Sequence, residues 1–194
     1  MAGYNAKGYR HFKDGLAADA YFKKNNYDWH KKLTDDEIFD IKKYTIVAED
    51  INDYLRDNSI TPSKFVLETI SGIRGAINKF NLKNNIVVYR STSSQEFNHD
   101  FETIQNLTQK GYLNKGFLSA SADYKATENF KKGENDILWE ISVPAGRGRG
   151  AYINNISYFK DKEYEFLLKD GTRMSINNVR YRDGKYYIKA EVIS

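Results

Sequence analysis

The chain has 194 residues, enough for a sizeable core, and we expect a single domain over residues 1–194. Thirty Lys and Arg against 26 Asp and Glu give a net charge of +4, which is too small to indicate a nucleic-acid-binding protein. The absence of cysteine excludes disulfides, and three scattered histidines predict no metal site. The sequence contains no apolar run of the roughly 18 residues that a membrane span needs, and its first residues lack the apolar core of a signal peptide.

The first half of the chain shows apolar residues at steps of three and four, the periodicity of amphipathic helices. Thr34 and Glu37 form a predicted capping box, in which each side chain satisfies a free backbone N–H group. Thr61 and Pro62 are expected to be the cap and the first residue of a later helix. The helices predicted in this way are 14–30, 34–57, 61–80 and 100–109.

The second half changes to the two-residue alternation of β-strands, which is clearest in residues 137–143. Asp170-Gly171 and Asp183-Gly184 each separate two β-type runs and predict hairpin turns, because both residue types tolerate positive φ. The strands predicted are 86–90, 137–143, 164–169, 172–181 and 185–193. Helices followed by a β-rich body indicate an α+β domain.

Two polar segments follow short β-type runs. Arg90 leads into the polar loop 91–95, and a guanidinium there can bind a phosphate through paired hydrogen bonds. A solvated or ion-paired surface arginine produces the same pattern. Ser119 and Ser121 follow Phe117-Leu118, and their small side chains can approach a ligand closely. An ordinary polar strand end is the alternative for this second segment.

Glu163 and Glu165 stand two positions apart before an apolar run. If both lie in a strand, they point to the same side about 7 Å apart, from a rise of ~3.3 Å per residue. Two carboxylates on one side repel each other, which favours a cationic partner or substrate and raises the pKa of one of them. An exposed strand face with two solvated glutamates is the alternative interpretation.

In the order Arg90, Ser119–Ser121, Glu163–Glu165, these pieces resemble the Arg-Ser-Glu class of bacterial mono-ADP-ribosyltransferase toxins. The segment Tyr44–Arg56 is similar to a helix over the NAD site in binary actin-modifying (iota-like) toxins and Rho-modifying exoenzymes. The resemblance runs from about residue 30 to the C-terminus, although Ala120 replaces the usual threonine. It implies N-terminal helices packed on a β-sandwich core of mixed or antiparallel strands.

The resemblance also implies NAD as a substrate, with no metal, and a role for each motif residue. Glu165 would stabilise the oxocarbenium-like centre, and Ser119 would hold Glu165 in place. Glu163 would serve an acceptor arginine, since a guanidinium pairs bidentately with a carboxylate and needs a base. Tyr158 and Phe159 would recognise the target protein, with a hydrophobic loop anchor as the alternative. The implied NAD contacts are Arg90 at the diphosphate, Gln95, Ser119, Ser121, Tyr44, Phe130 and Lys132 or Lys131.

The expected function is therefore that of a secreted toxin, acting as a monomer in the host cytosol on an arginine of a host protein. Actin is the first expected target, and a Rho-type GTPase or another host protein is the alternative. A translocation component is a further expected partner, whereas nucleic acid is not. Two other functions remain open: hydrolysis of NAD alone, and the adaptor half of a binary toxin, which usually lacks the catalytic glutamates.

Overall fold

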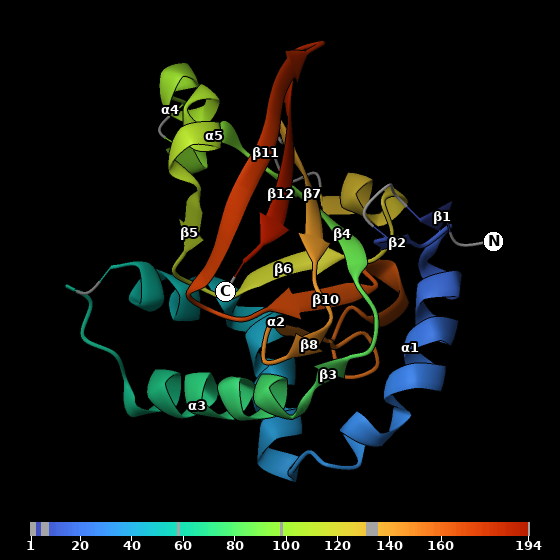
Figure 1. The fold of residues 1–194 in the computed structure, drawn as a ribbon. Helices are drawn as coiled ribbons and strands as arrows, with labels where there is room; N and C mark the ends of the chain where they lie inside the picture. Colours follow the sequence, from blue (N-terminus) through green and yellow to red (C-terminus); the bar gives the residue numbers. More distant parts are fainter. Residues whose placement is uncertain (1–2, 5–7, 58, 98, 131–135, 194) are drawn as a thin grey trace.

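The computed structural model describes residues 3–4, 8–57, 59–97, 99–130 and 136–193. Its helices lie mainly in the first half of the chain and its strands mainly in the second, which confirms the α+β class (Figure 1). The helices are α1 (Gly15–His30), α2 (Asp35–Arg56), α3 (Lys64–Lys79), α4 (Phe101–Gln105) and α5 (Leu107–Lys110), with 3-10 turns η1 (Ser94–Phe97), η2 (Lys125–Phe130) and η3 (Lys160–Lys162). The strands are β1 (Gly3–Tyr4), β2 (Arg10–His11), β3 (Asn81–Leu82), β4 (Ile86–Thr92), β5 (Tyr112–Asn114), β6 (Leu118–Ser121), β7 (Ile137–Val143), β8 (Gly146–Arg147), β9 (Gly150–Tyr152), β10 (Glu165–Leu168), β11 (Thr172–Arg182) and β12 (Lys185–Val192).

Most strands join in one mixed sheet with the order β5-β11-β12-β7-β4-β6-β10-β9. Strands β7 and β12 are parallel, whereas β4 pairs antiparallel with both β7 and β6. Within the described residues a single pair, Tyr89 with Ser121, joins β4 to β6. This joint separates a long part of the sheet (β5, β11, β12, β7 and β4) from a short part (β6, β10 and β9), and Figure 1 shows the strands of the two parts running in crossing directions.

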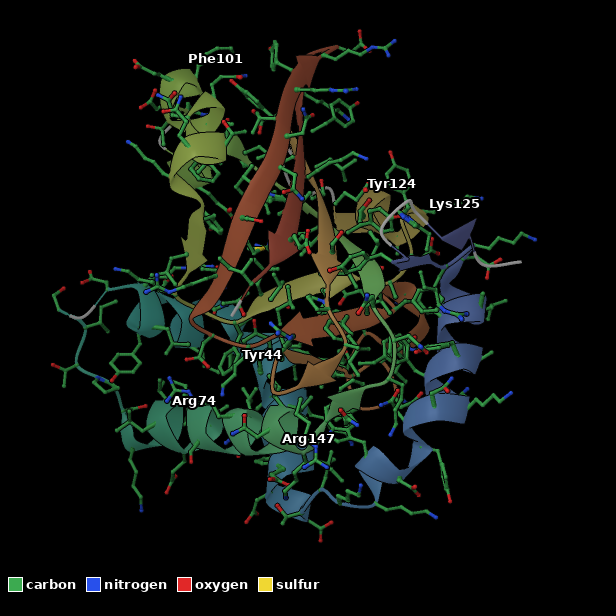
Figure 2. All side chains as sticks on the ribbon, in the orientation of Figure 1. Tyr44, Arg74, Phe101, Tyr124, Lys125 and Arg147 are labelled. Carbon is green, nitrogen blue, oxygen red and sulfur yellow. The ribbon has the colours of Figure 1, made fainter. Side chains whose placement is uncertain are left out.

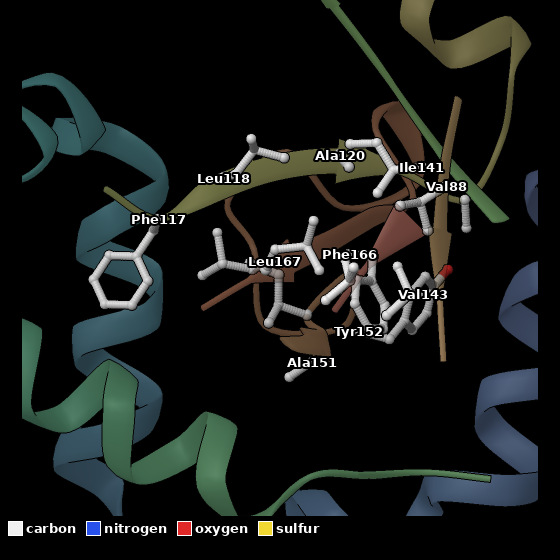
Figure 3. Close-up of a cluster of buried hydrophobic side chains, with 14 of the residues drawn as sticks. Val88, Phe117, Leu118, Ala120, Ile141, Val143, Ala151, Tyr152, Phe166 and Leu167 are labelled. Carbon is white, nitrogen blue, oxygen red and sulfur yellow. The ribbon is translucent and has the colours of Figure 1, made fainter. Parts of the chain in front are cut away.

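The two parts of the sheet face each other across a shared apolar core. Figure 3 shows Val88 and Ile141 of the long part beside Ala120, Tyr152 and Phe166 of the short part. The strand β7 explains its half of this contact, because its residues are alternately buried and half-buried, as the period of two predicts. Face-to-face packing of two sheet layers is the sandwich arrangement that the resemblance implies.

Helix boundaries follow the predicted caps in one case and not in another. The capping box at the start of α2 is confirmed, with Thr34 N–H donating to Glu37 at 2.8 Å and Glu37 N–H donating to Thr34 at 3.2 Å. Thr61 as the cap of α3 is wrong: Ser63 caps it by accepting from the backbone N–H of Val66 at 3.2 Å. None of the described helices combines the length and apolar character required to cross a bilayer.

The two Asp-Gly turns differ in what they connect. Asp183-Gly184 joins β11 to its neighbour β12, so this predicted hairpin is confirmed. Asp170-Gly171 does not form a hairpin, because β10 pairs with β6 and β9 while β11 pairs with β12 and β5. Asp170 instead makes an ion pair with Arg74 of α3 at 2.5 Å. The turn therefore carries the chain from the short part of the sheet to the long part.

Candidate active site

Arg90 projects from β4 at the joint between the two parts of the sheet. The strand continues to Thr92, so the prediction that it ends at Arg90 is wrong. Arg90 Nη1 donates to the backbone carbonyl of Ser119 at 2.9 Å, and Nη2 lies 3.2 Å from a carboxylate oxygen of Glu96. The guanidinium is thus held in place by one contact to β6 and by one ion pair that an incoming anion can replace.

Glu165 is the first residue of β10 and lies opposite Ser121 of β6. It is 3% exposed, and the side chains of Ser119 and Ser157 lie beside its carboxylate. Burial raises the pKa of Glu165 to about 7 and the nearby Glu163 charge adds to this rise, whereas the two serines and Arg90 oppose it.

One oxygen of the Glu165 carboxylate, Oε2, is buried and has no hydrogen-bond partner among the described residues. A buried acceptor without a donor is costly, so such an oxygen marks a place where a ligand can supply the donor. A ribose hydroxyl is a donor of this kind. The arrangement therefore fits the expected role of Glu165 beside the oxocarbenium-like centre that forms on the ribose of NAD.

Glu163 does not lie in the strand, so the prediction of two side chains on one strand face is wrong. It follows η3 with φ −117° and ψ −24°, and Tyr164 after it has φ +46°. The carbonyl of Tyr164 accepts from Ala122 N–H at 3.0 Å, and its ring packs against Gly15, where a Cβ would come within 2.1 Å. These contacts hold Tyr164 in the left-handed region, which turns Glu163 away from the strand. Burial raises the pKa of Glu163.

Ser121 is fully buried and connects β6 to the loop before β10. Its hydroxyl donates to the carbonyl of Glu163 at 2.6 Å and accepts from the backbone N–H of Asp123 at 3.0 Å. The predicted contact between Ser121 and NAD stays a prediction. In the structure, the Ser121 side chain supports the backbone of Glu163.

Tyr158 and Phe159 lie in the loop between Ser157 and η3, with side chains that are 69% and 38% exposed. Their rings contact each other edge to face at a centroid distance of 5.5 Å. The loop is fixed through its backbone, since Tyr158 N–H donates to the Thr45 hydroxyl and Phe159 N–H to that of Ser157, each at 3.2 Å. The rings are therefore accessible from solvent, and their contact with a target protein stays a prediction.

The remaining predicted NAD contacts differ in their positions. Gln95 is exposed on η1, next to the Glu96 that pairs with Arg90. Tyr44 on α2 is 1% exposed, and its hydroxyl accepts from the side-chain amide of Asn52 rather than facing solvent. The side chain of Phe130, together with Lys131 and Lys132, lies outside the described residues. No group of three or more metal-binding side chains occurs in the part of the chain that the structure describes.

Sequence reasoning missed three residues that hold the site together. Glu96 pairs with Arg90, Ser157 lies beside Glu165, and Asn52 donates a hydrogen bond to Tyr44 at 3.2 Å. Asn52 had one signal, since a polar residue interrupts the buried side of the α2 apolar stripe beside Ile51. The sequence carried no such signal for Ser157 or Glu96. Ser157 is distant in sequence from Glu165, and a turn separates Glu96 from Arg90.

The buried carboxylate, the arginine at the joint and the serine that links them define an ADP-ribosyltransferase of the exotoxin class. The chain belongs to the ADP-ribosyltransferase exoenzyme family, whose model matches residues 18–193. NAD is accordingly its substrate. Membership of the family confirms the class that the ordered arginine, serine and glutamate motifs predicted.

Three individual relatives support this assignment. The chain is 30% identical over 158 residues to the NAD(+)–arginine ADP-ribosyltransferase EFV of Enterococcus faecalis, a match that covers 78% of this chain but only 30% of that protein. Among solved structures, Plx2a, an ADP-ribosyltransferase toxin of Paenibacillus larvae, is 26% identical with a TM-score of 0.79, covering 95% of this chain and 98% of Plx2a. BECa, an ADP-ribosylating toxin of a C. perfringens binary enterotoxin solved with NADH, is 25% identical with a TM-score of 0.77, covering 95% of this chain and 50% of BECa.

Proposed function

We propose that this chain is a single catalytic domain that transfers ADP-ribose from NAD to an arginine side chain of a host protein. The observation that carries the proposal is the Glu165 carboxylate, which is buried, lies beside Ser119 and Ser157, and has one oxygen unpaired among the described residues. It lies beside Glu163, a second carboxyl group at the edge of the loop that bears the exposed aromatic rings.

Cleavage of NAD requires stabilisation of positive charge on the ribose as nicotinamide leaves. An ionised Glu165 supplies an anion where that charge develops, and an anion fixed in a buried site acts more strongly on the transition state than a solvated one. Its unpaired oxygen accepts a hydrogen bond from a ribose hydroxyl group. Arg90 exchanges its ion pair with Glu96 for the diphosphate, with which its planar fork makes paired hydrogen bonds.

Glu163 is assigned to the acceptor. A guanidinium pairs with a carboxylate through two hydrogen bonds, and loss of its proton makes it a nucleophile. Burial raises the pKa of Glu163, which brings this carboxyl group closer to the range in which it can accept a proton. The Enterococcus faecalis relative, named as an arginine transferase, supports the same acceptor. Tyr158 and Phe159 would contact the protein that carries the arginine.

Actin is the proposed target, on the basis of the resemblance to binary actin-modifying toxins, and a Rho-type GTPase is the second candidate. Secretion, action in the host cytosol, a translocation partner and a monomeric state belong to the same proposal. The presence of both Glu163 and Glu165 favours this function over that of a non-catalytic adaptor.

The experiment is incubation of the protein and its Glu165→Gln variant with labelled NAD and, in separate reactions, actin, a Rho GTPase or a host-cell lysate. Mass spectrometry then locates the modified residue. We expect label on an arginine with the wild-type protein and no label with the variant. Label on asparagine would contradict the assigned acceptor, and NAD consumption without any labelled protein would favour the hydrolase alternative.

A further inference from the structure

The start of α1 meets the segment that follows β6. Asp14 caps the helix by accepting from Ala17 N–H at 2.9 Å, which satisfies one of the N–H groups that a first helical turn leaves unpaired. The N–H of Gly15 donates instead to a carboxylate oxygen of Asp123 at 3.1 Å. The other oxygen of Asp123 accepts from Lys125 N–H at 2.9 Å, and Figure 2 shows Lys125 on the side of the molecule where α1 begins. A buried aspartate therefore ties α1 to the end of β6.

Gly15 also leaves space for the ring of Tyr164, from the loop before β10. A Cβ at position 15 would overlap carbons of this ring, so a larger residue fits there only if the ring moves. Tyr164 has φ +46°, a left-handed conformation that costs energy in a residue with a large side chain and persists only where the surroundings impose it. Two contacts impose it here: the ring lies against Gly15, and the Tyr164 carbonyl accepts from Ala122 N–H at 3.0 Å.

The two glutamates on either side of Tyr164 depend on this conformation to different degrees. Glu163 lies outside the strand, and the left-handed residue after it sets the direction in which the chain enters β10. Glu165 lies within the strand, where β10 pairs with β6, and its carbonyl accepts from Ile153 N–H at 3.0 Å. The position of Glu165 is thus fixed by sheet pairing, whereas that of Glu163 depends on how Tyr164 is held.

We propose that Gly15 is a positioning residue for Glu163: by making room for the Tyr164 ring, it keeps Tyr164 left-handed and Glu163 in place for the acceptor arginine. The start of α1 thereby controls transfer to protein without controlling NAD cleavage. Gly15 lies before residue 18, where the match to the family model begins, so this support comes from outside the matched segment. The inference rests on the proposed function, and the experiment below separates the failure of one from the failure of the other.

Variants at two positions separate the space at residue 15 from the conformation at residue 164. Gly15→Ala removes the space for the ring. Tyr164→Val removes the ring and introduces a β-branched side chain, for which positive φ is strongly disfavoured. Tyr164→Gly also removes the ring, but glycine adopts positive φ without support. Gly72→Ala is the matched control, because a Cβ there would overlap the carboxylate of Asp40 on α2, at a contact between helices.

Three quantities are measured: transfer of labelled ADP-ribose to the proteins of a host-cell lysate, nicotinamide release without lysate, and the NMR coupling constant between the amide and α protons of residue 164, which reports its φ. We expect Gly15→Ala and Tyr164→Val to change φ and to lower transfer about ten- to a hundred-fold, because a small misplacement of a reacting group has effects of that size. Nicotinamide release should stay close to that of the wild type.

Tyr164→Gly should keep most of the transfer, and the double variant Gly15→Ala/Tyr164→Gly should regain what Gly15→Ala alone loses. Both expectations follow because glycine holds the left-handed conformation without a ring contact. Gly72→Ala should lower the urea midpoint without separating transfer from nicotinamide release.

An unchanged coupling constant in Gly15→Ala would overturn the inference, as would an equal loss of transfer and nicotinamide release. A loss of transfer in Tyr164→Gly as large as in Gly15→Ala would also overturn it, because the ring itself would then be required. A changed coupling constant with wild-type transfer would support the positioning by Gly15 and overturn the assignment of Glu163 to the acceptor. If Gly15→Ala does not fold, Tyr164→Gly and Tyr164→Val decide the question, and equal transfer by these two would contradict the inference.

Discussion

The hydroxyl of Ser121 donates to the backbone carbonyl of Glu163 at 2.6 Å, so the second serine of the motif supports the first glutamate through its main chain. The same hydroxyl accepts from Asp123 N–H, and both contacts lie in the fully buried end of β6. The position of Glu163 in front of β10 therefore depends on a side chain that is buried at the end of β6.

Ser121→Ala should lower protein modification more than NAD cleavage, because it frees the segment that carries Glu163 and leaves Glu165 supported by Ser119 and Ser157. It should also cost about 1–3 kcal/mol of stability, since a buried N–H and a buried carbonyl lose their partner. Urea unfolding and parallel transfer and cleavage assays measure the two effects. An equal loss of both activities would place Ser121 in the support of Glu165 instead.

Glu163→Gln and Glu165→Gln should separate the two steps of the reaction. Glu165→Gln is expected to lose NAD cleavage and protein transfer together, since it removes the anion beside the developing charge. Glu163→Gln is expected to lose most transfer while keeping NAD binding and a measurable rate of hydrolysis, because water needs less activation than a protonated guanidinium. Nicotinamide release without target and label transfer with target are compared for each variant. Equal loss of both activities in Glu163→Gln would end the assignment of this residue to the acceptor.

Arg90→Ala should weaken NAD binding about ten- to a hundred-fold, the range expected when charge-assisted hydrogen bonds worth roughly 1.5–3 kcal/mol are lost. Arg90→Lys should restore only part of the affinity, because an ammonium group cannot form the paired contacts of a guanidinium. Calorimetric titration with NAD gives the dissociation constants. Since Arg90 also bonds to the Ser119 carbonyl, a thermal melt of each variant serves as the structural control. Wild-type affinity in a folded Arg90→Ala protein would rule out the phosphate contact.

The pKa of Glu165 predicts a pH-dependent gain in stability from Glu165→Gln. The folded-state pKa is about 7 against an ordinary value of 4.5, so the native state holds this proton more tightly than the unfolded state. Wild-type stability should therefore fall as the pH rises through this window, by up to about 1.4 kcal/mol for each pH unit, and a neutral glutamine escapes the loss. Urea unfolding at pH 4 and pH 8 tests this: the variant should gain on the wild type only at the higher pH. An advantage of the same size at both values would mean that ionisation of Glu165 does not cause it.

Local patterns in the sequence predicted the elements whose contacts are themselves local. The alternation in residues 137–143 gave β7 with its correct bounds, and the capping box of Thr34 and Glu37 placed the start of α2. Asp170-Gly171 shows the limit of such patterns. The dipeptide marks a turn correctly, but whether the strands on either side pair depends on their distant partners in the sheet.

The site was predicted in its residues better than in its geometry. The structure does bring together the three motif residues Arg90, Ser119 and Glu165. They could be predicted from the sequence because their order along the chain is typical of the family. The alternation that places Glu163 beside Glu165 failed at Tyr164, whose positive φ is uncommon for a residue with a large side chain and depends on contacts with Ala122 and Gly15.

The joint between β4 and β6 has a consequence for substrate binding. Arg90 lies on β4 in the long part of the sheet, and Glu165 lies on β10 in the short part. Among the described residues a single pair, Tyr89 with Ser121, joins β4 to β6 and so connects the two parts. A dinucleotide bound by both residues would bridge the two crossing parts of the sheet and hold them together for as long as it stays bound. Because a ligand that binds only the native state stabilises it by mass action, saturation with NAD should slow hydrogen exchange most strongly at the amides around Tyr89 and Ser121.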